Sequence, residues 1–137
     1  MAAAANNPGI SLRKPTVLVV EDDVLIRLSV ADALRSAGLD VIEAATGDEA
    51  LTVLASSATV DLVFTDIQMP GSTDGLALAQ IARQMRPSLK IIVTSGNAPA
   101  RPSPGLADAF FGKPYAFDRL VERIKGLLGS DGSPNFK

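Results

Sequence analysis

The 137-residue chain contains neither histidine nor cysteine. Without histidine, the protein has no imidazole for acid–base catalysis or metal binding, and it cannot form a phosphohistidine of its own. Without cysteine, disulfides and thiol chemistry are excluded, which fits a reducing compartment. These absences leave carboxylates, hydroxyls and amines as the groups from which a site can be built.

The chain also lacks a strong net charge and any long apolar run. The net charge is -2, and the 13 lysines and arginines are scattered along the sequence, which disfavours nucleic-acid binding. No apolar stretch approaches the roughly 20 residues of a membrane span. The N-terminal sequence MAAAANNPG lacks the basic start and apolar core of a signal peptide. We therefore expect a cytoplasmic protein that contacts neither membrane nor, directly, nucleic acid.

What the chain does contain is a regular alternation of strand and helix signals. We expect one domain over residues 15–128, between flexible tails at residues 1–14 and 129–137. Strands are predicted over residues 16–20, 41–44, 61–65, 89–94 and 110–111. The first helix is predicted to bury Val24, Leu28, Ala31 and Leu34, and the third helix Leu78, Ile81, Ala82 and Met85. Thr46 and Glu49 form a capping box that predicts the start of the second helix.

The segment from Asn97 to Asp108 breaks this alternation, because it contains Pro99, Pro102 and Pro104. Each proline removes an amide donor and costs a helix interior about 3 kcal/mol. We predict a loop here, or at most one turn. The pattern indicates a five-stranded parallel sheet with helices on both faces, in which a Pro-rich loop replaces most of the fourth crossover helix.

Three of the predicted strands end in polar residues. Residues 17–20 lead into Glu21, Asp22 and Asp23, residues 62–65 into Asp66, and residues 91–93 into Thr94. Parallel strands place such groups together at the carboxyl edge of the sheet, where open α/β folds have their sites.

Carboxylates gathered at this edge repel one another. Two of them about 5 Å apart repel by roughly 3 kcal/mol at an effective dielectric near 20. A divalent cation relieves that repulsion, and Mg²⁺ suits a site with few protein ligands and a phosphate. Each acid taken alone is equally well explained as a helix cap, for which Asp23 is the best candidate. Thr94 and Lys113 could contact a phosphate at the same edge, although a threonine or lysine in such a place is usually structural or solvated.

Four segments resemble the motifs of the receiver domain of two-component response regulators. They are VLVVEDD (17–23), VFTDIQMPGSTDG (63–75), IIVTSG (91–96) and FFGKPY (110–115), in the same order and with similar spacing. The resemblance spans about residues 15–128 and implies a flavodoxin-like (βα)5 doubly wound sheet with strand order 2-1-3-4-5.

The resemblance also implies roles for individual residues. Asp66 would accept a phosphoryl group, and Glu21, Asp22, Asp66 and the backbone carbonyl of Gln68 would bind Mg²⁺ or Mn²⁺. Thr94 and Lys113 would contact the phosphoryl group. Phe110, three residues before Lys113, would form a conformational switch with Thr94, unless it is simply part of the core.

The implied function is phosphorylation-dependent signalling. The donor would be a sensor histidine kinase or a histidine phosphotransfer protein, and the output a conformational change that acts on an unknown protein partner. Kinase specificity is expected on the exposed face of the first helix and on nearby loops, where Leu25, Arg27, Ser29 and Asp32 are predicted to lie. We also hypothesise that the order of the loop 97–108 depends on phosphorylation. No output domain follows Leu128, so the chain resembles a stand-alone receiver, or a piece excised from a longer protein.

Two alternatives remain open at this point. An aspartyl-phosphate phosphatase would carry a second acid two residues after the nucleophile, whereas this chain has Gln68 there. We therefore expect no enzyme activity beyond the protein's own phosphorylation and dephosphorylation. The second alternative is a degenerate receiver that binds a partner without ever carrying phosphate.

Overall fold

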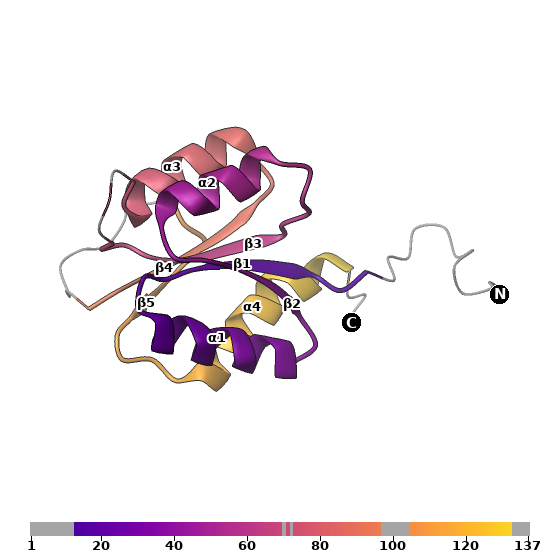
Figure 1. The fold of residues 1–137 in the computed structure, drawn as a ribbon. Coiled ribbons are helices and arrows are strands. Elements are labelled where there is room, and N and C mark those ends of the chain that lie inside the picture. The colour runs from indigo at the N-terminus through magenta and orange to yellow at the C-terminus, as the bar shows by residue number, and fades with distance from the viewer. Residues whose placement is uncertain (1–12, 70, 72, 97–104, 133–137) are drawn as a thin grey trace.

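The computed structural model describes residues 13–69, 71, 73–96 and 105–132. Its five parallel strands form one sheet in the order β2-β1-β3-β4-β5 (Figure 1), which confirms the predicted flavodoxin-like topology. The strands are β1 (Thr16–Val20), β2 (Asp40–Ala44), β3 (Leu62–Asp66), β4 (Lys90–Ser95) and β5 (Ala109–Gly112). The helices are α1 (Val24–Ser36), α2 (Gly47–Ala55), α3 (Gly75–Met85) and α4 (Phe117–Gly132).

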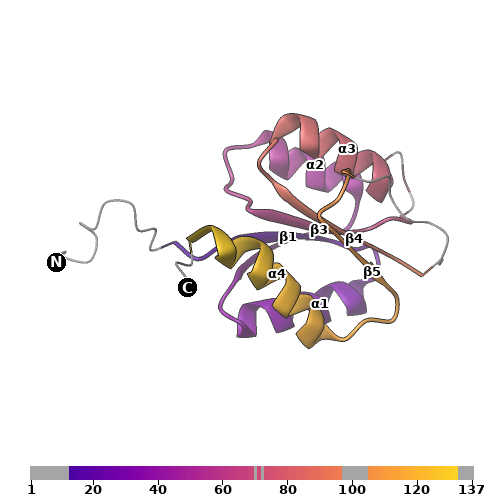
Figure 2. The same ribbon diagram turned by 180° about the vertical axis from the view of Figure 1, so that it is seen from behind.

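The helices cover both faces of the sheet. Figures 1 and 2 show α2 and α3 packed on one face and α1 and α4 on the other. Strand side chains alternate between the two faces, so Leu18 and Val63 join the α2/α3 core while Val19 and Phe64 join the α1/α4 core. All residues of β1 and β3 are buried, as expected for central strands covered on both sides.

Side-chain caps begin the first three helices. Asp23 accepts hydrogen bonds from the amides of Leu25 and Ile26 at the start of α1, which confirms its predicted role. Thr46 accepts from the Glu49 amide at the start of α2. The Glu49 carboxylate reaches back to the amide of Ala45 at 2.7 Å, one residue before the cap, so the capping box is a variant of the predicted one.

No helix is found between β4 and β5 among the residues described there, Gly96 and 105–108. The predicted loop 97–108 lies outside the described residues over 97–104, and so does the hypothesis that phosphorylation orders it. Its last part is anchored, because Asp108 accepts hydrogen bonds from Arg83 at 3.1 Å and from the Ile91 amide at 2.8 Å. Leu106 packs against the α2/α3 core.

Two helix faces differ from their prediction. On α1, Val24 and Leu28 are half exposed, and the buried residues are Val30, Ala31 and Leu34. On α3, Ile81 and Met85 are more than a third exposed, although Leu78 and Ala82 are buried as predicted. The periodicity identified an apolar stripe correctly in each case. The stripe is wider than the surface that the sheet and neighbouring helices cover.

The ends of the folded part extend slightly beyond the predicted boundaries. Arg13, in the predicted N-terminal tail, forms a hydrogen-bonded ion pair with Asp61 at 2.8 Å. Helix α4 continues past Leu128 to Gly132. Within the described residues, none of the helices has the length and hydropathy needed to cross a membrane.

Candidate functional site

Three carboxylates meet at the carboxyl edge of the sheet. One oxygen each of Glu21, Asp22 and Asp66 lies within 4.8 Å of the others. Strands β1 and β3 are neighbours, which brings the turn after β1 beside the last residue of β3. Glu21 and Asp66 are buried, whereas Asp22 is exposed. The predicted acidic cluster is therefore present, with one open side at Asp22.

Lys113 joins the cluster from the turn after β5. Its Nζ lies 2.6 Å from Oδ2 of Asp66 and 3.5 Å from Oε1 of Glu21. Its backbone amide donates to the carbonyl of Ser95 at 2.9 Å, which fixes the turn against β4. Burial disfavours the ammonium charge, but the hydrogen bond and charge of Asp66, together with Glu21, outweigh burial and raise the pKa of Lys113. The lysine is thus held charged beside Asp66.

The surroundings of Glu21 disfavour the negative charge of its carboxylate. Burial raises the pKa of its carboxyl group, and the charge of Asp66 adds to that effect. The Asp23 amide, which donates to Oε2 of Glu21 at 3.0 Å, and Lys113 act in the opposite direction. The net rise means that the site favours an additional positive charge near Glu21.

Asp66 is held by its own backbone surroundings. Its Oδ1 accepts a hydrogen bond from the Gln68 amide at 3.1 Å, and the Ile67 amide donates to the Thr94 carbonyl at 2.8 Å. The first residue of α3, Gly75, lies so close that an added Cβ would come 1.9 Å from the Asp66 carbonyl oxygen. Only glycine permits this approach of the helix to the strand. That the Gln68 carbonyl binds a metal stays a prediction.

Thr94 lies beside Asp66 in the register of β3 and β4. Its side chain is fully buried, and its Oγ1 has no hydrogen-bond partner in the described part of the chain. Buried hydroxyls normally have a partner, so this one is available to a ligand at the site. Phe110, the predicted switch residue, is half buried and packs against the α2/α3 core. Its role as a switch stays a prediction.

Tyr115 is a residue near the site to which the sequence reasoning gave no role. Its ring makes edge contacts with Phe64 and Phe111, at centroid distances of 5.8 and 6.1 Å. Its buried hydroxyl has no partner among the described residues, and burial, with the charges of Glu21 and Asp66, raises the pKa of Tyr115. The tyrosine also lines a surface hollow of about 400 Å³ with Lys113 and Phe117. Its position in the sequence, two residues after Lys113, could have indicated that Tyr115 lies near the site.

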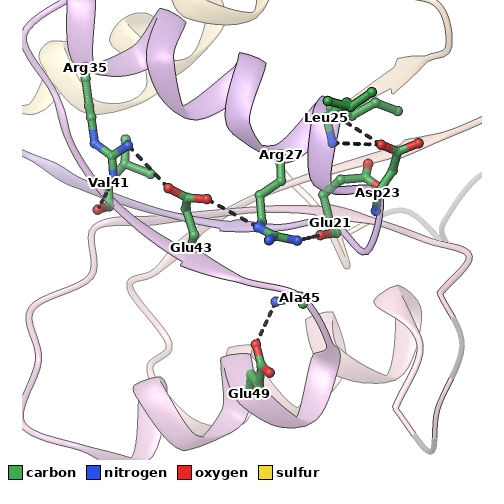
Figure 3. A network of polar contacts seen from close by, with 10 residues as sticks. Glu21, Asp23, Leu25, Arg27, Arg35, Val41, Glu43, Ala45 and Glu49 are labelled. Carbon is green, nitrogen blue, oxygen red and sulfur yellow. Dashed lines mark hydrogen bonds and ion pairs between the residues drawn. The ribbon is translucent and has the colours of Figure 1, made fainter.

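The exposed face of α1 is as predicted except at one residue. Leu25, Ser29 and Asp32 are exposed. Arg27 was expected beside them, but its side chain is only 17% exposed. It turns toward the site, where its Nη1 donates to the backbone carbonyl of Glu21 at 2.8 Å (Figure 3). Its planar guanidinium, which carries several donors, can bond this carbonyl and the Glu43 carboxylate at the same time.

The donor set fits a hard divalent cation. All three side chains offer carboxylate oxygens, which Mg²⁺ and Mn²⁺ prefer, and Asp22 leaves room for water. The raised pKa of Glu21 and the orphan hydroxyl of Thr94 point the same way, because a cation and an anionic group together would satisfy both.

Comparison with known proteins gives a consistent result. A sequence model described as the response regulator receiver domain matches residues 17–125. The sensor kinase CckA of Brucella abortus is 40% identical over 120 residues, which cover 82% of this chain and 12% of the kinase. The DNA-binding transcriptional regulator NtrC of Salmonella typhimurium is 34% identical over 122 residues, covering 85% of this chain and 25% of NtrC. This chain therefore spans only a small part of the length of these two relatives.

A solved structure is similar over nearly its whole length. It is that of the response regulator protein TrrA from Thermotoga maritima in complex with Mg²⁺ and BeF. The TM-score is 0.75 at 34% identity, and the match covers 82% of this chain and 98% of TrrA. The fold and the motifs thus lead to the same group of proteins.

Proposed function

The chain belongs to the family of response regulator receiver domains, and from that membership we propose that Asp66 accepts a phosphoryl group from a phosphohistidine. The donor belongs to a sensor histidine kinase or a histidine phosphotransfer protein, since this chain has no histidine. The observation that carries the proposal is the buried Asp66 carboxylate at the end of β3, with Lys113 Nζ at 2.6 Å.

The reaction transfers one phosphoryl group. An Asp66 carboxylate oxygen forms a bond to phosphorus while the phosphorus–nitrogen bond of the donor breaks, and the departing imidazole takes up a proton. Lys113 offers its charge to the phosphoryl oxygens. The residues that would hold a metal are the clustered Glu21, Asp22 and Asp66. The family resemblance implies the backbone carbonyl of Gln68 as a further ligand. Bound Mg²⁺ or Mn²⁺ would supply charge neutralisation for the anionic groups.

The signal follows from the new charge on Asp66. The Thr94 hydroxyl, which has no partner in the described structure, would donate to a phosphoryl oxygen. Movement of Thr94 would change the packing of Phe110 and thereby the surface offered to a downstream protein. Phe110 packs against the α2/α3 core, and its register partner on β4 is Val93, the residue directly before Thr94.

The phosphoryl donor is proposed to dock beside the site. Apolar side chains are exposed there on the first turns of α1 and at the start of α4: Val24, Leu25, Leu28 and Phe117. Leu25 is the most exposed of them at 73%. An apolar patch next to charged groups is typical of a protein-binding surface.

The test is phosphorylation in vitro. After incubation with acetyl phosphate and Mg²⁺, the intact mass of the full chain is expected to increase by one phosphoryl group. Asp66→Asn should remove that increase, because an amide cannot form the acyl phosphate. Asp32→Asn, an exposed aspartate on α1, is the matched control and should take up phosphate as the natural chain does.

Each alternative has its own outcome in this experiment. Absence of any added phosphate would favour a degenerate receiver that binds partners without phosphorylation. Phosphate uptake that survives Asp66→Asn would place the acceptor elsewhere. Steady turnover of a phosphate ester at about 1 per second or faster, an ordinary enzyme rate, would instead indicate a phosphatase.

A further inference from the structure

Hydrogen bonds to its backbone and to its side chains hold the acid turn, residues 21–23, in place. The Glu21 amide donates to the Ala44 carbonyl of β2 at 3.1 Å. The Glu21 carbonyl accepts from Arg27 Nη1 at 2.8 Å, and the Glu21 side chain accepts from the Asp23 amide at 3.0 Å. Both backbone groups of Glu21 therefore have a partner, and one of these partners is a side chain.

Arg27 is itself fixed by an ion-pair network (Figure 3). Its Nε lies 3.3 Å from Oε1 of Glu43, and Oε2 of Glu43 lies 3.3 Å from Nη1 of Arg35. Arg35 also donates to the Val41 carbonyl at 3.2 Å. Glu43 is the register partner of Val19, whose side chain faces α1, so its carboxylate lies between α1 and β2. The network thus ties α1 and β2 to the turn that carries two of the three acids.

The charge of Arg27 alone cannot explain a benefit to this site. A guanidinium near a cation site repels the cation, and by charge alone its removal would strengthen metal binding. The direction of the side chain suggests a different contribution. Arg27 bonds to the backbone carbonyl of Glu21 and to Glu43, and no ion pair with the three clustered acids is found for it among the described residues.

We propose that Arg27 is a positioning residue for the metal site. By holding the Glu21 carbonyl, it sets the directions in which the Glu21 and Asp22 carboxylates leave the turn, and Glu43 holds Arg27 in place. The inference rests on the proposed function in one respect, namely that the acidic cluster binds Mg²⁺.

Direct Mg²⁺ titration of the full chain by calorimetry, without any phosphoryl donor, tests the proposal. Arg27→Gln is expected to weaken Mg²⁺ binding about tenfold, the usual size of effect when a group that orients a metal ligand is removed. Glu43→Gln keeps the Arg27 charge but loosens the side chain, so it should weaken binding by a smaller factor. Arg119→Gln is the matched control, because Arg119 is exposed on α4 and belongs neither to this network nor to the acid turn, and the affinity of that variant should stay near that of the natural chain.

A merely structural role predicts something different. The thermal midpoint of metal-free Arg27→Gln would then fall, while the Mg²⁺ affinity of the folded variant would not change.

If Arg27 positions the acid turn, Arg27→Lys should recover part of the affinity, because the ammonium can still reach one acceptor but cannot bond the carbonyl and Glu43 together.

The possible results separate this inference from the proposed function. Unchanged or tighter Mg²⁺ binding by folded Arg27→Gln would overturn the inference and leave the proposed function standing. If Arg27→Gln does not fold, unchanged binding by Glu43→Gln would overturn it in the same way. Absence of Mg²⁺ binding by the natural chain would remove the proposed metal site and the inference with it.

Discussion

The two ends of strand β3 carry the same chemical group in opposite circumstances. Asp61, just before the strand, accepts hydrogen bonds from Arg13 on both oxygens, at 2.8 and 3.1 Å, and from the Thr16 amide at 2.7 Å. The hydrogen bond from Arg13 lowers the pKa of Asp61. Asp66, the last residue of the strand, shares one lysine with a second buried acid, Glu21, whose pKa burial raises.

The difference separates stability from function within a single strand. At the Asp61 end, the carboxylate is fully matched by donors, so its charge stabilises the fold. At the Asp66 end, negative charge exceeds positive charge and the Thr94 hydroxyl has no partner in the described structure. Such unmatched groups cost stability in the free protein and become favourable when a cation and a phosphoryl group arrive.

The backbone of the Asp66 end is, by contrast, tightly packed, and a substitution there is expected to have the largest effect. Gly75→Ala should lower the free energy of unfolding by about 3 kcal/mol, because the new Cβ would meet the Asp66 carbonyl oxygen and force α3 away from β3. Phosphoryl uptake at Asp66 should decline as well. Chemical denaturation and the mass assay measure the two effects.

Gly126→Ala is the control for this substitution. Gly126 lies exposed in α4 with nothing within 4 Å of an added Cβ. Alanine should therefore stabilise the helix by up to about 1 kcal/mol and leave phosphoryl uptake unchanged. An equal response of both variants would show that the approach of Gly75 to Asp66 is not a constraint on the site.

The second prediction compares the two kinds of carboxylate through pH. Asp61→Asn should lower the free energy of unfolding at neutral pH by about 1.5 kcal/mol, since charged hydrogen bonds to Arg13 and the Thr16 amide are weakened. The pKa of Asp61 is lowered in the folded protein. Its contribution is therefore present above the usual value of 3.8 and is lost as the pH falls through the folded pKa.

Glu21 has the opposite sign. Because its pKa is raised by folding, its ionisation opposes folding, and this cost develops as the pH rises from the usual value of 4.5 through the folded pKa. In metal-free buffer, Glu21→Gln should therefore gain stability relative to the natural chain as the pH rises above 4.5. Asp61→Asn should lose stability relative to the natural chain at lower pH, as the pH rises through the folded pKa of Asp61 towards 3.8. Urea unfolding between about pH 3 and about pH 7 measures both. Parallel pH profiles for the two variants would contradict the comparison.

The sequence was sufficient for the parts of the molecule that repeat a local rule. Strand and helix alternation, with the resemblance of four motifs, predicted the sheet order, and polar residues at strand ends predicted the cluster of Glu21, Asp22 and Asp66. The sheet order and the acidic cluster could both be predicted because the motifs and strand-end residues that indicate them lie within short stretches of the sequence.

The remaining features depend on partners that are distant in the sequence. Arg27 was predicted to face solvent because charged helix residues usually do, but its partners are a turn carbonyl and Glu43, 16 positions away. Val24 and Leu28 match the helical period and still lie outside the buried face. Helical periodicity gives the spacing of an apolar stripe, but the fraction of the stripe that is buried depends on the neighbouring elements that cover it.

The smallest expected effect comes from two fully buried threonines on neighbouring strands. Thr65 Oγ1 donates to the Asp66 carbonyl at 3.0 Å, whereas Thr94 Oγ1 has no partner in the described structure. Thr65→Val should cost about 1 kcal/mol of unfolding free energy, and Thr94→Val should cost nothing or gain a similar amount, because valine removes an unsatisfied hydroxyl. In the phosphorylated protein, Thr94→Val should instead lower the free energy of unfolding, because the Thr94 hydroxyl then has an acceptor. Denaturation of both variants with and without phosphorylation measures this. A Thr94→Val cost equal to that of Thr65→Val before phosphorylation would mean that the Thr94 hydroxyl is already bonded, and that the Asp66 end is as fully matched as the Asp61 end.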